Sequence, residues 1–226
     1  MMILDYLFPL TRSIIPADHG YFVYCAVSDI LPKVHLTGAA AKDPDNPWVH
    51  VAVHPIWGAP AGTRSIRIEP SSRLIIRAPH ELGSDLLGLA GKSLRIGQAR
   101  IRLGIPVPRC LEPAGRLRSR LVVIKGFQEP EGFLDAARRQ MQALGIQGEL
   151  SIPQRTTLRP VEGLKGAQGG AEIRRTLQIR DKVIVGFALE VGGLNPVDSV
   201  RLQETGLGGR RRFGCGVFVG AVNNSE

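Results

Sequence analysis

The sequence predicts an α+β protein made of two consecutive β-α-β-β-α-β units. Apolar, β-branched runs alternate with helical patterns in which apolar residues recur every three to four positions. Glycines and prolines separate these runs, and the same order of patterns is found in both halves of the chain. The chain has 226 residues, 43% of them hydrophobic, which is enough to bury one large core or two small ones.

In the N-terminal half, the first predicted strand runs from Met2 to Leu10 and the first helix from Gly20 to about His35. Asp18 precedes this helix and is expected to cap its N-terminus. A second strand is predicted from Trp48 to Trp57, because this stretch is rich in Val, Ile and Trp and flanked by prolines. The half is completed by a strand that ends in RLIIRAP, a helix through HELGSDLLGLAG and a strand in KSLRIGQARIRLG.

In the C-terminal half, Arg120 to Phe127 is a β-branched run, and the helical pattern PEGFLDAARRQMQALG that follows it ends at Gly145. IQGELSIP predicts a strand, and RRTLQIRDKVIVGFALEV predicts a hairpin that turns near residues 180–182. Asn195 is the expected N-cap of the next helix, with Pro196 at its first position. GVFVGAV is the last predicted strand.

The boundary between the halves is expected in the Pro-, Gly- and Arg-containing segment from Pro106 to Gly115. This placement gives one unit at residues 1–110 and a second at residues 116–226. The segment is short for a free linker, so the two units are expected to pack tightly against each other.

Several classes of protein are disfavoured by the sequence. It has no run of about 18 apolar residues and no basic stretch ahead of its first apolar residues, so neither a membrane span nor a secretory signal is expected. Cys25, Cys110 and Cys215 are widely spaced, without a CxxC pair, which argues against disulfides and a structural zinc site. A cytoplasmic protein is the working expectation.

Positive charge is the main clue to a partner. The net charge is +9, and seven arginines lie between Arg95 and Arg120 against one acid, Glu112. Clustered cationic side chains neutralise phosphates and release counterions, which makes a polyanion the first partner to consider. A solvated basic surface is the alternative. No helix-turn-helix or zinc-finger pattern accompanies the charge, which argues against binding of bare DNA.

The stretch GLGGRRRFGCGVF, residues 206–218, combines glycines with three consecutive arginines. It is not a dinucleotide-binding loop, because it leads from a predicted helix into a strand and such a loop does the reverse. GLAGKS at residues 88–93 also precedes a strand, which excludes a P-loop. Backbone N–H groups in a glycine-rich loop can approach an anion closely, and Arg210, Arg211 and Arg212 add fork-shaped donors. We expect a cradle for a phosphate backbone; an ordinary glycine-rich turn is the alternative.

The same stretch matches, position for position, the pattern G-h-G-x(5)-G-h-G, where h is apolar. With this glycine pattern, the stretch closely resembles the C-terminal glycine-rich loop of the CRISPR-associated RAMP proteins. PADHGYFVYCAVSDILP and VHPIWG resemble, within that superfamily, the sixth Cas family of repeat-processing endoribonucleases, in its MYXAN-type branch. The resemblance implies tandem ferredoxin-like domains of the β-α-β-β-α-β kind.

The activity implied by this resemblance is cleavage of precursor CRISPR RNA within each repeat, without a metal ion or cofactor. Enzymes of this family often stay bound to the 3′ hairpin of the cleaved RNA. The chemistry needs a base near the ribose 2′-hydroxyl and donors around the scissile phosphate, and it leaves a 2′,3′-cyclic phosphate. Histidine is the natural base, because its pKa lies near working pH.

His35 is the first candidate for this base, since many family members carry a catalytic histidine near the end of the first helix. His54 is the second candidate, and His50 would share its face in a regular strand. His19 and His80 are expected to have structural roles at the starts of helices. Family members vary in their second catalytic group. Tyr21, which shares one helix face with Tyr24 and Ser28, is the candidate here, with core packing as the alternative. Lys33 and Lys42 are candidates for stabilising charge on the phosphate.

Recognition is expected to depend on phosphates and duplex shape, because only 5% of the residues are aromatic. The expected RNA contacts come from the glycine-rich loop, the basic region and the polar segment that follows Pro153. They are Gly206, Gly208, Gly209, Arg210, Arg211, Arg212, Gly214, Gly216, Arg118, Arg155, Arg174 and Arg175.

A CRISPR repeat hairpin is the expected partner, and other Cas subunits of a Cascade-type or transposon-associated complex are further candidates. Two alternatives stay open. One is a non-catalytic scaffold of the same fold that caps guide RNA inside an effector complex. The other is a general basic RNA-modifying or ribosome-associated protein.

Overall fold

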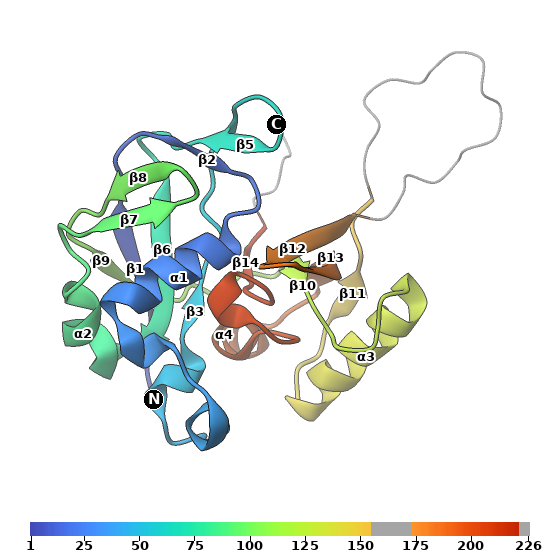
Figure 1. The fold of residues 1–226 in the computed structure, drawn as a ribbon. Coiled ribbons are helices and arrows are strands. Elements are labelled where there is room, and N and C mark those ends of the chain that lie inside the picture. The colour runs from blue at the N-terminus through green and yellow to red at the C-terminus, as the bar shows by residue number, and fades with distance from the viewer. Residues whose placement is uncertain (155–172, 222–226) are drawn as a thin grey trace, which may run out of the picture.

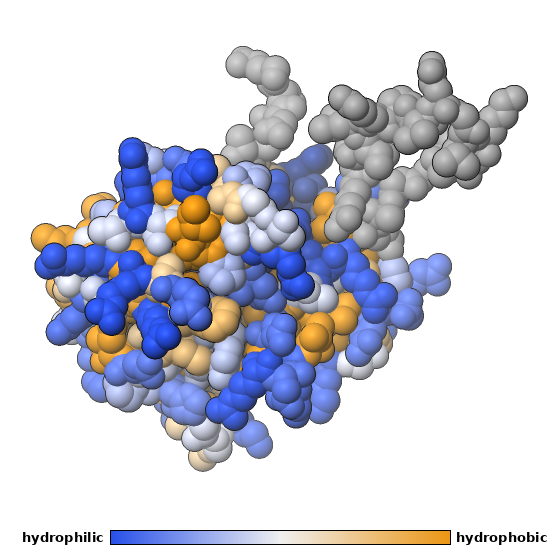
Figure 2. All heavy atoms as spheres, turned by 45° about the horizontal axis from the view of Figure 1, so that its top comes forward, coloured by the Kyte–Doolittle hydropathy of each residue, from blue (hydrophilic) through white to orange (hydrophobic). Residues whose placement is uncertain are grey.

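The computed structural model describes residues 1–154 and 173–221, and it has one main antiparallel sheet in each half of the chain. Figure 1 shows the N-terminal sheet on the left, with helix α1 (Gly20–Ile30) across its face. The C-terminal sheet lies on the right, with helix α3 (Pro130–Ala143) on its outer side. The face shown in Figure 2 is largely hydrophilic and interrupted by small apolar patches.

The N-terminal sheet has the order β3-β6-β1-β9. Its strands are β1 (Ile3–Pro9), β3 (Ala52–Val53), β6 (Arg73–Pro79) and β9 (Val107–Cys110). The two helices of this half are α1 and the short α2 (Gly83–Leu87). Val23 and Val27 lie one turn apart on α1, so both reach the core, where they pack with Phe8 and Leu74.

Two small sheets are added to this half. β2 (Ile14–Pro16), β5 (Ser65–Arg67) and β4 (Ala59–Pro60) form a three-stranded sheet in the order β2-β5-β4. β7 (Ser93–Ile96) and β8 (Ala99–Arg102) form a separate hairpin. The three-stranded sheet lies beside the start of α1, because the Ala17 N–H, just before this helix, donates to the Arg64 carbonyl at 2.8 Å.

The C-terminal sheet has the order β11-β13-β10-β14. Its strands are β10 (Leu117–Val122), β11 (Glu149–Ser151), β13 (Lys182–Gly192) and β14 (Val219–Gly220). β12 (Arg174–Ile179) pairs with the first part of β13. α3 and α4 (Pro196–Thr205) cover one face, where Phe133, Phe187 and Leu202 belong to one core.

The two main sheets share one topology. If the four strands of each unit are numbered along the chain, both sheets have the order second, third, first, fourth. Each unit also has one helix between its first and second strands and another between its third and fourth. This arrangement confirms the α+β class and the tandem ferredoxin-like fold. The predicted hairpin of β12 and β13 is confirmed, and so is the cap of α4, where Asn195 Oδ1 accepts from the Asp198 N–H at 2.8 Å.

One predicted strand of the N-terminal half is much shorter than predicted. Only Ala52 and Val53 of the Trp48–Trp57 stretch are in a strand, and residues 47–50 form a 3-10 turn instead. Pro47 starts this turn and the Asn46 side chain accepts from the Trp48 N–H at 3.0 Å, which stabilises the turn against an extended backbone. His50 and His54 therefore do not share a strand face.

Other boundaries also differ from the prediction. α1 ends at Ile30 rather than near His35, because Pro32 restricts the residue before it to non-helical angles. The KSLRIGQARIRLG stretch forms the β7–β8 hairpin, and the last position of the main sheet is taken by β9. β9 lies inside the Pro106–Gly115 segment, so the first part of that segment is a sheet strand. The final strand is reduced to Val219–Gly220.

The two halves are joined by polar contacts between buried groups. Arg77 on β6 is 1% exposed and forms a bidentate ion pair with Asp5 on β1, at 2.7 and 2.9 Å. Its remaining nitrogen, Nη1, donates to the carbonyls of Gln203 and Phe218 in the other half, at 2.8 and 2.9 Å. Asp18 does not cap α1; its carboxylate accepts from the Gln178 N–H of β12 at 2.8 Å.

Candidate functional site

The glycine-rich loop, residues 206–216, follows α4 and folds back on itself. Gly206 and Gly216 have φ of 66° and 65°, a conformation that favours glycine. A Cβ at Gly206 would lie 2.2 Å from the Gly216 carbonyl oxygen, and a Cβ at Gly216 would lie 2.1 Å from that of Leu207. Both positions therefore require glycine, because the start and the end of the loop cross in direct contact.

The N–H groups of the glycines are used inside the protein. Those of Gly209 and Gly216 donate to the carbonyls of Val123 and Leu121 on the neighbouring segment, at 2.9 and 2.7 Å. The Gly208 N–H donates to Gln140 Oε1 at 2.7 Å. Gly206 and Gly214 donate to carbonyls of the preceding turns. The expected cradle of free glycine N–H groups is thus not what the loop presents, and the glycines fix the position of the arginines instead.

The three consecutive arginines occupy different environments. Arg210 is exposed and has left-handed backbone angles. Arg211 faces inward, where its Nη2 lies 3.5 Å from the Gln203 carbonyl and its Nε is buried. Burial and the nearby charge of Arg77 lower the pKa of Arg211 to about 10. Arg212 is half-buried, and this burial lowers its pKa. All three arginines border one hollow beside Phe213, and Arg210 and Arg212 are the two whose side chains are not turned inward.

His35 lies beside this loop. The imidazole is exposed, directly after the short turn at residues 32–34. Its Nδ1 shares a hydrogen bond of 2.5 Å with the Tyr24 hydroxyl. The Tyr24 ring lies 4.3 Å from the ring of Phe213, measured between centroids. An exposed imidazole, a tyrosine hydroxyl and the arginine-bearing loop are thus brought together from three separate segments.

Tyr21 lies one turn before Tyr24 on α1. Its ring stacks on Phe213 at 6.2 Å between centroids, and its hydroxyl accepts from Arg180 Nε at 3.1 Å. Of the two tyrosines, Tyr24 rather than Tyr21 contacts His35. The sequence predicted both tyrosines on one face of the helix. Which of them contacts His35 is decided by the conformation of residues 31–35, which follow the helix.

The other histidines have different positions. His54 is 4% exposed, and its Nε2 lies 3.5 Å from Asp5 Oδ1; burial lowers its pKa. His19 is 3% exposed, its Nδ1 bonds to the Pro16 carbonyl and its Nε2 accepts from the Ile56 N–H at 2.9 Å. Burial lowers the pKa of His19 to about 4. Neither ring is placed to reach RNA. His50 bonds to the Pro44 carbonyl, and His80 is exposed on a short turn before α2.

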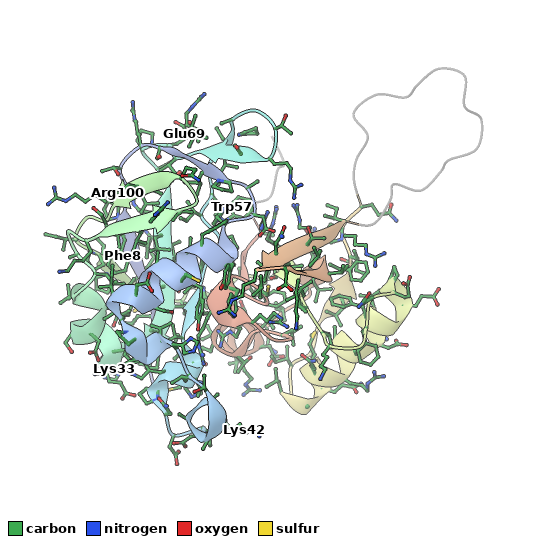
Figure 3. The ribbon with its side chains drawn as sticks, in the orientation of Figure 1. Phe8, Lys33, Lys42, Trp57, Glu69 and Arg100 are labelled. Atoms are coloured by element: carbon green, nitrogen blue, oxygen red, sulfur yellow. The ribbon has the colours of Figure 1, made fainter. Side chains whose placement is uncertain are left out.

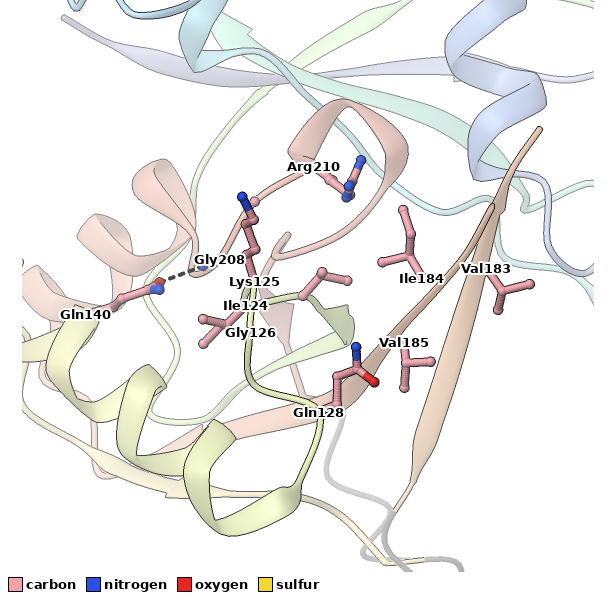
Figure 4. Close-up of a pocket in the computed structure, with 12 residues that line it drawn as sticks. Ile124, Lys125, Gly126, Gln128, Gln140, Val183, Ile184, Val185, Gly208 and Arg210 are labelled. Atoms are coloured by element: carbon pink, nitrogen blue, oxygen red, sulfur yellow. Dashed lines mark hydrogen bonds between the residues drawn. The ribbon is translucent and has the colours of Figure 1, made fainter. Parts of the chain in front are cut away.

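A cavity of about 330 Å³ opens on one side of the glycine-rich loop (Figure 4). It is bounded by the turn at residues 123–128, by residues 183–185 of β13 and by residues 208–210. Lys125 and Arg210 contribute its positive charge, and Figure 4 shows Gln140 reaching Gly208 at its edge. Phosphate groups are the ligands that such a cationic hollow would take.

The remaining predicted contacts are spread over several elements. Arg118 on β10 lies over the Trp57 ring, 5.7 Å from its centroid, and Trp57 is placed between the halves (Figure 3). Arg118 and Arg175 both line a small hollow on the C-terminal sheet. Arg174 is exposed on β12. Arg155 lies outside the described residues.

The basic region from Arg95 to Arg120 does not form one patch. Its arginines belong to the β7–β8 hairpin, to β9 and to the β10 segment, which are parts of three different sheets. Lys33 pairs with Asp85 at 3.1 Å, and both Lys33 and Lys42 lie towards the end of the N-terminal half that is away from β5 (Figure 3). Basic residues that are close in the sequence are therefore not gathered into one basic surface in the structure.

Within residues 1–154 and 173–221, no group of three or more His, Cys, Asp or Glu side chains is arranged to hold a metal ion. In the same part of the chain, no helix has the length and apolarity needed to cross a bilayer. Cys25, Cys110 and Cys215 are free thiols, and burial raises the pKa of Cys215, inside the loop, to about 12.

Comparison with known proteins extends these observations. Residues 4–223 match the family model described as Cas6 Crispr. The CRISPR-associated endonuclease Cas6 of Myxococcus xanthus (strain DK1622) is 33% identical over 219 residues, which cover 97% of this chain and 82% of that protein.

Solved structures share the fold at low sequence identity. A CRISPR-associated protein Cas6 superposes with a TM-score of 0.60 at 12% identity and covers 98% of this chain and 99% of its own. A RAMP protein described as binding different RNA substrates gives a TM-score of 0.59 at 15% identity, with 96% and 98% covered. A Cas6-related protein from Pyrococcus furiosus gives 0.58 at 16% identity, with 96% and 97% covered. With a family match over nearly the whole sequence and a relative of 33% identity, the chain belongs to the Cas6 family.

Proposed function

We propose that this protein is a CRISPR RNA-processing endoribonuclease, which binds precursor CRISPR RNA and cleaves it within each repeat. The observation that carries the proposal is the contact between Tyr24 and two partners: its hydroxyl bonds to His35, and its ring packs on Phe213 of the glycine-rich loop. The candidate base and the candidate phosphate-binding loop therefore lie close together. Cleavage of a ribose-phosphate chain requires both groups at the same phosphodiester bond. The relative from Myxococcus xanthus, named as a CRISPR-associated endonuclease, supports the same class of activity.

The hydrogen bond between His35 and Tyr24 is compatible with the tautomer that the reaction needs. When Nδ1–H donates to the Tyr24 oxygen, Nε2 keeps its lone pair and is free to act as a base. His35 Nε2 then removes the proton from a ribose 2′-hydroxyl, and the 2′-oxygen attacks the adjacent phosphorus. The bond from phosphorus to the 5′-oxygen breaks, that oxygen leaves as a hydroxyl after it takes up a proton from solvent, and a 2′,3′-cyclic phosphate remains.

Charge on the phosphate increases as the reaction proceeds, and the loop supplies cations to balance it. Arg212 directly precedes Phe213, whose ring contacts Tyr24, while Arg210 and Lys125 line the neighbouring cavity. Guanidinium groups held by a rigid loop need little reorganisation, which makes them effective stabilisers of such charge. We propose that His35, positioned by Tyr24, and Arg212 act at the cleaved bond, and that Arg210 and Lys125 hold the adjoining backbone. Retention of the 3′ hairpin and delivery of the RNA to a Cascade-type complex are part of this proposal.

The test is incubation of the protein with RNA of the CRISPR repeat encoded beside its gene, in the presence of EDTA. We expect a 5′ fragment that ends in a 2′,3′-cyclic phosphate, and no cleavage of RNA with a 2′-deoxyribose at the cut site. His35→Ala is expected to lower the cleavage rate at least about a hundredfold and to leave binding unchanged. Tight binding of the repeat hairpin without any cleavage by the unaltered protein would favour the non-catalytic scaffold.

A further inference from the structure

A second cavity lies apart from the one at the glycine-rich loop. It has a volume of about 510 Å³, within the range of small-molecule sites, and is formed where the start of α1, the β4–β5 hairpin and the β12–β13 turn meet. Arg64 and Arg180 line it from the two hairpins. Tyr21 and Phe22 line it from α1, and Phe22 is 42% exposed. Two guanidinium groups and two aromatic rings thus surround one hollow.

The backbone at both arginines is strained. Among the described residues, the non-glycine residues with positive φ are three, and all are arginines: Arg64 (56°), Arg180 (54°) and Arg210 (67°). A side chain in this region brings its Cβ close to the following carbonyl oxygen, which is why glycine or asparagine usually occupies it. Such strain persists where the surroundings enforce it, and it is concentrated at functional sites. Arg210 already belongs to the proposed RNA site, and the other two face this second cavity.

Hydrogen bonds hold both strained residues in place. The Arg64 carbonyl accepts from the Ala17 N–H at 2.8 Å, which ties the β4–β5 hairpin to the segment before α1. The Arg180 carbonyl accepts from the Gln178 side chain at 3.1 Å, and Arg180 Nε donates to the Tyr21 hydroxyl at 3.1 Å. One acid, Asp18, also lines the cavity, and its carboxylate is engaged by the Gln178 N–H. Two positive charges against one negative charge favour an anionic ligand.

The ligand class follows from the combination of groups. Arginine forks suit a phosphate, and an accessible aromatic face suits a planar base. A hollow lined by two aromatic side chains suits an unstacked nucleotide better than a base-paired stem, whose bases are already stacked. Tyr21 and Tyr24 lie one turn apart on α1 and both contact Phe213, so the cavity adjoins the proposed site of cleavage. A nucleotide near the cut and outside the hairpin stem meets all these conditions.

We propose that this cavity binds one unpaired nucleotide of the substrate RNA, with its phosphate between Arg64 and Arg180 and its base against Tyr21 and Phe22. The inference rests on the proposed function, because it assumes that the substrate is RNA with a hairpin. It adds a subsite that binds the single-stranded RNA beside the hairpin. The subsite would help to set the position of the cut, since it fixes the strand on one side of the attacked ribose.

The test compares the binding of three RNAs: the bare repeat hairpin, the hairpin with its 5′ single-stranded flank and the hairpin with its 3′ flank. We expect one flank to raise the affinity about tenfold, which is a typical effect of stacking one base. In the double variant Arg64→Gly/Arg180→Gly the gain from the flank is expected to vanish, while affinity for the bare hairpin stays unchanged. The salt dependence of flanked-RNA binding is expected to fall by about one unit of slope for each lost phosphate contact.

The choice of glycine keeps this test independent of folding. Glycine adopts positive φ without the clash, so the double variant is expected to keep or raise the melting temperature of the protein. Arg67→Ala is the matched control, because Arg67 is an exposed arginine on the same hairpin that does not line the cavity. RNA that carries 4-thiouridine at single flanking positions is expected to cross-link to the peptide with Tyr21 and Phe22 from one position only.

The outcomes separate the two proposals. If the unaltered protein binds the bare hairpin but gains nothing from either flank, the nucleotide subsite is overturned and the proposed function stands. If the double variant binds flanked RNA as the unaltered protein does, the cavity serves another ligand, such as a protein partner, and the subsite is again overturned. If the unaltered protein does not bind the bare hairpin at all, the proposed function itself fails.

Discussion

Arg210, Arg211 and Arg212 are adjacent in sequence, yet each side chain has a different role. Arg210 is exposed and lines a cavity, Arg211 is buried near Arg77 and Asp5 of the other half, and Arg212 is half-buried beside Phe213. The left-handed backbone at Arg210 and the tight turn at residues 211–213 separate the three directions. A run of like charges in a sequence is therefore not one binding surface, because the backbone conformation of each residue decides where its charge points.

Substitution of single arginines should separate these roles. Arg212→Met is expected to weaken binding of repeat RNA and to reduce the slope of its salt dependence by about one unit, because a phosphate contact is lost. Arg211→Met is expected to leave both unchanged. It should be neutral or stabilising in urea unfolding, since burial and the charge of Arg77 already disfavour a cation at this position. If Arg212→Met and Arg211→Met lost RNA affinity equally, the different roles assigned to Arg211 and Arg212 would be wrong.

Tyr24 is expected to position His35 through its hydroxyl. Tyr24→Phe keeps the ring on Phe213 and removes only the partner of Nδ1, so the cleavage rate should fall about tenfold or more while RNA affinity is maintained. Tyr6→Phe is the control, because it removes one hydroxyl bonded to the His80 carbonyl, away from the site. Single-turnover cleavage kinetics provide the measurement. Unchanged kinetics in Tyr24→Phe would show that the hydrogen bond does not orient the base.

The glycine-rich loop is the element on which the site depends. Its first and last glycines are in contact, and its inner glycines bond to the segment that follows β10 and to α3. The loop is thus folded by its own packing rather than by a ligand. This construction explains the spacing of its glycines, because each close approach occurs at a fixed distance along the chain.

Two glycines of this loop provide a matched comparison. Gly216→Ala would place a Cβ 2.1 Å from a carbonyl oxygen at positive φ, so we expect a loss of at least about 2 kcal/mol in the free energy of unfolding and a loss of RNA binding. Gly209→Ala meets no atom within 4 Å, and its stability should change by less than about 0.5 kcal/mol. Urea unfolding and filter binding measure the two effects. A tolerated alanine at Gly216 would mean that the loop ends do not need to cross.

At the scale of the whole molecule, the site depends on the contact between the two halves. His35 and Tyr24 come from the N-terminal half and the glycine-rich loop from the C-terminal half. Arg77 bonds to the Gln203 carbonyl just before the loop and to the Phe218 carbonyl just after it. The buried pair of Asp5 and Arg77 therefore links the N-terminal sheet to both ends of the loop, and so fixes the loop relative to the half that carries His35 and Tyr24.

This contact should make the protein sensitive to acid. Burial by itself raises the pKa of Asp5, but His54 and Arg77 outweigh it and hold this pKa well below its ordinary value of 3.8. A lowered pKa means that ionised Asp5 contributes stability at neutral pH, and that this stability is lost as the pH falls from about 5 towards the pKa of the folded state. Urea unfolding of the unaltered protein between pH 7 and pH 3 should show this decline.

Asp5→Asn tests the origin of the decline. The variant is expected to be about 3 kcal/mol less stable at pH 7, because Arg77 is left buried without its charged partner. The difference from the unaltered protein should shrink as the pH falls. Asp135→Asn, which removes an exposed pair with Arg138, should change the stability by less than about 0.5 kcal/mol at every pH. If the difference in stability between Asp5→Asn and the unaltered protein stayed constant from pH 7 to pH 3, ionisation of Asp5 would not be the cause of the acid sensitivity.

The sequence by itself determined the order of most elements, the α+β class and the position of the glycine-rich loop. Those features depend on local periodicity and on residues with special backbone angles, which are visible in short stretches. It overestimated the length of the strand predicted from Trp48 to Trp57, because a proline and an asparagine cap outweighed the strand preference of Val and Trp at its start.

Tertiary structure decided which of the chemically similar residues meet. It buried His54 and His19, left His35 exposed beside Tyr24, turned Arg211 inward, and placed two strained arginines around a cavity with Tyr21 and Phe22. Sequence patterns could not rank these residues, because burial and contact depend on the packing of segments that lie far apart in the chain. The physical reason is that each exposed or buried state is set by the neighbours that surround a side chain, and those neighbours come from both halves of the molecule.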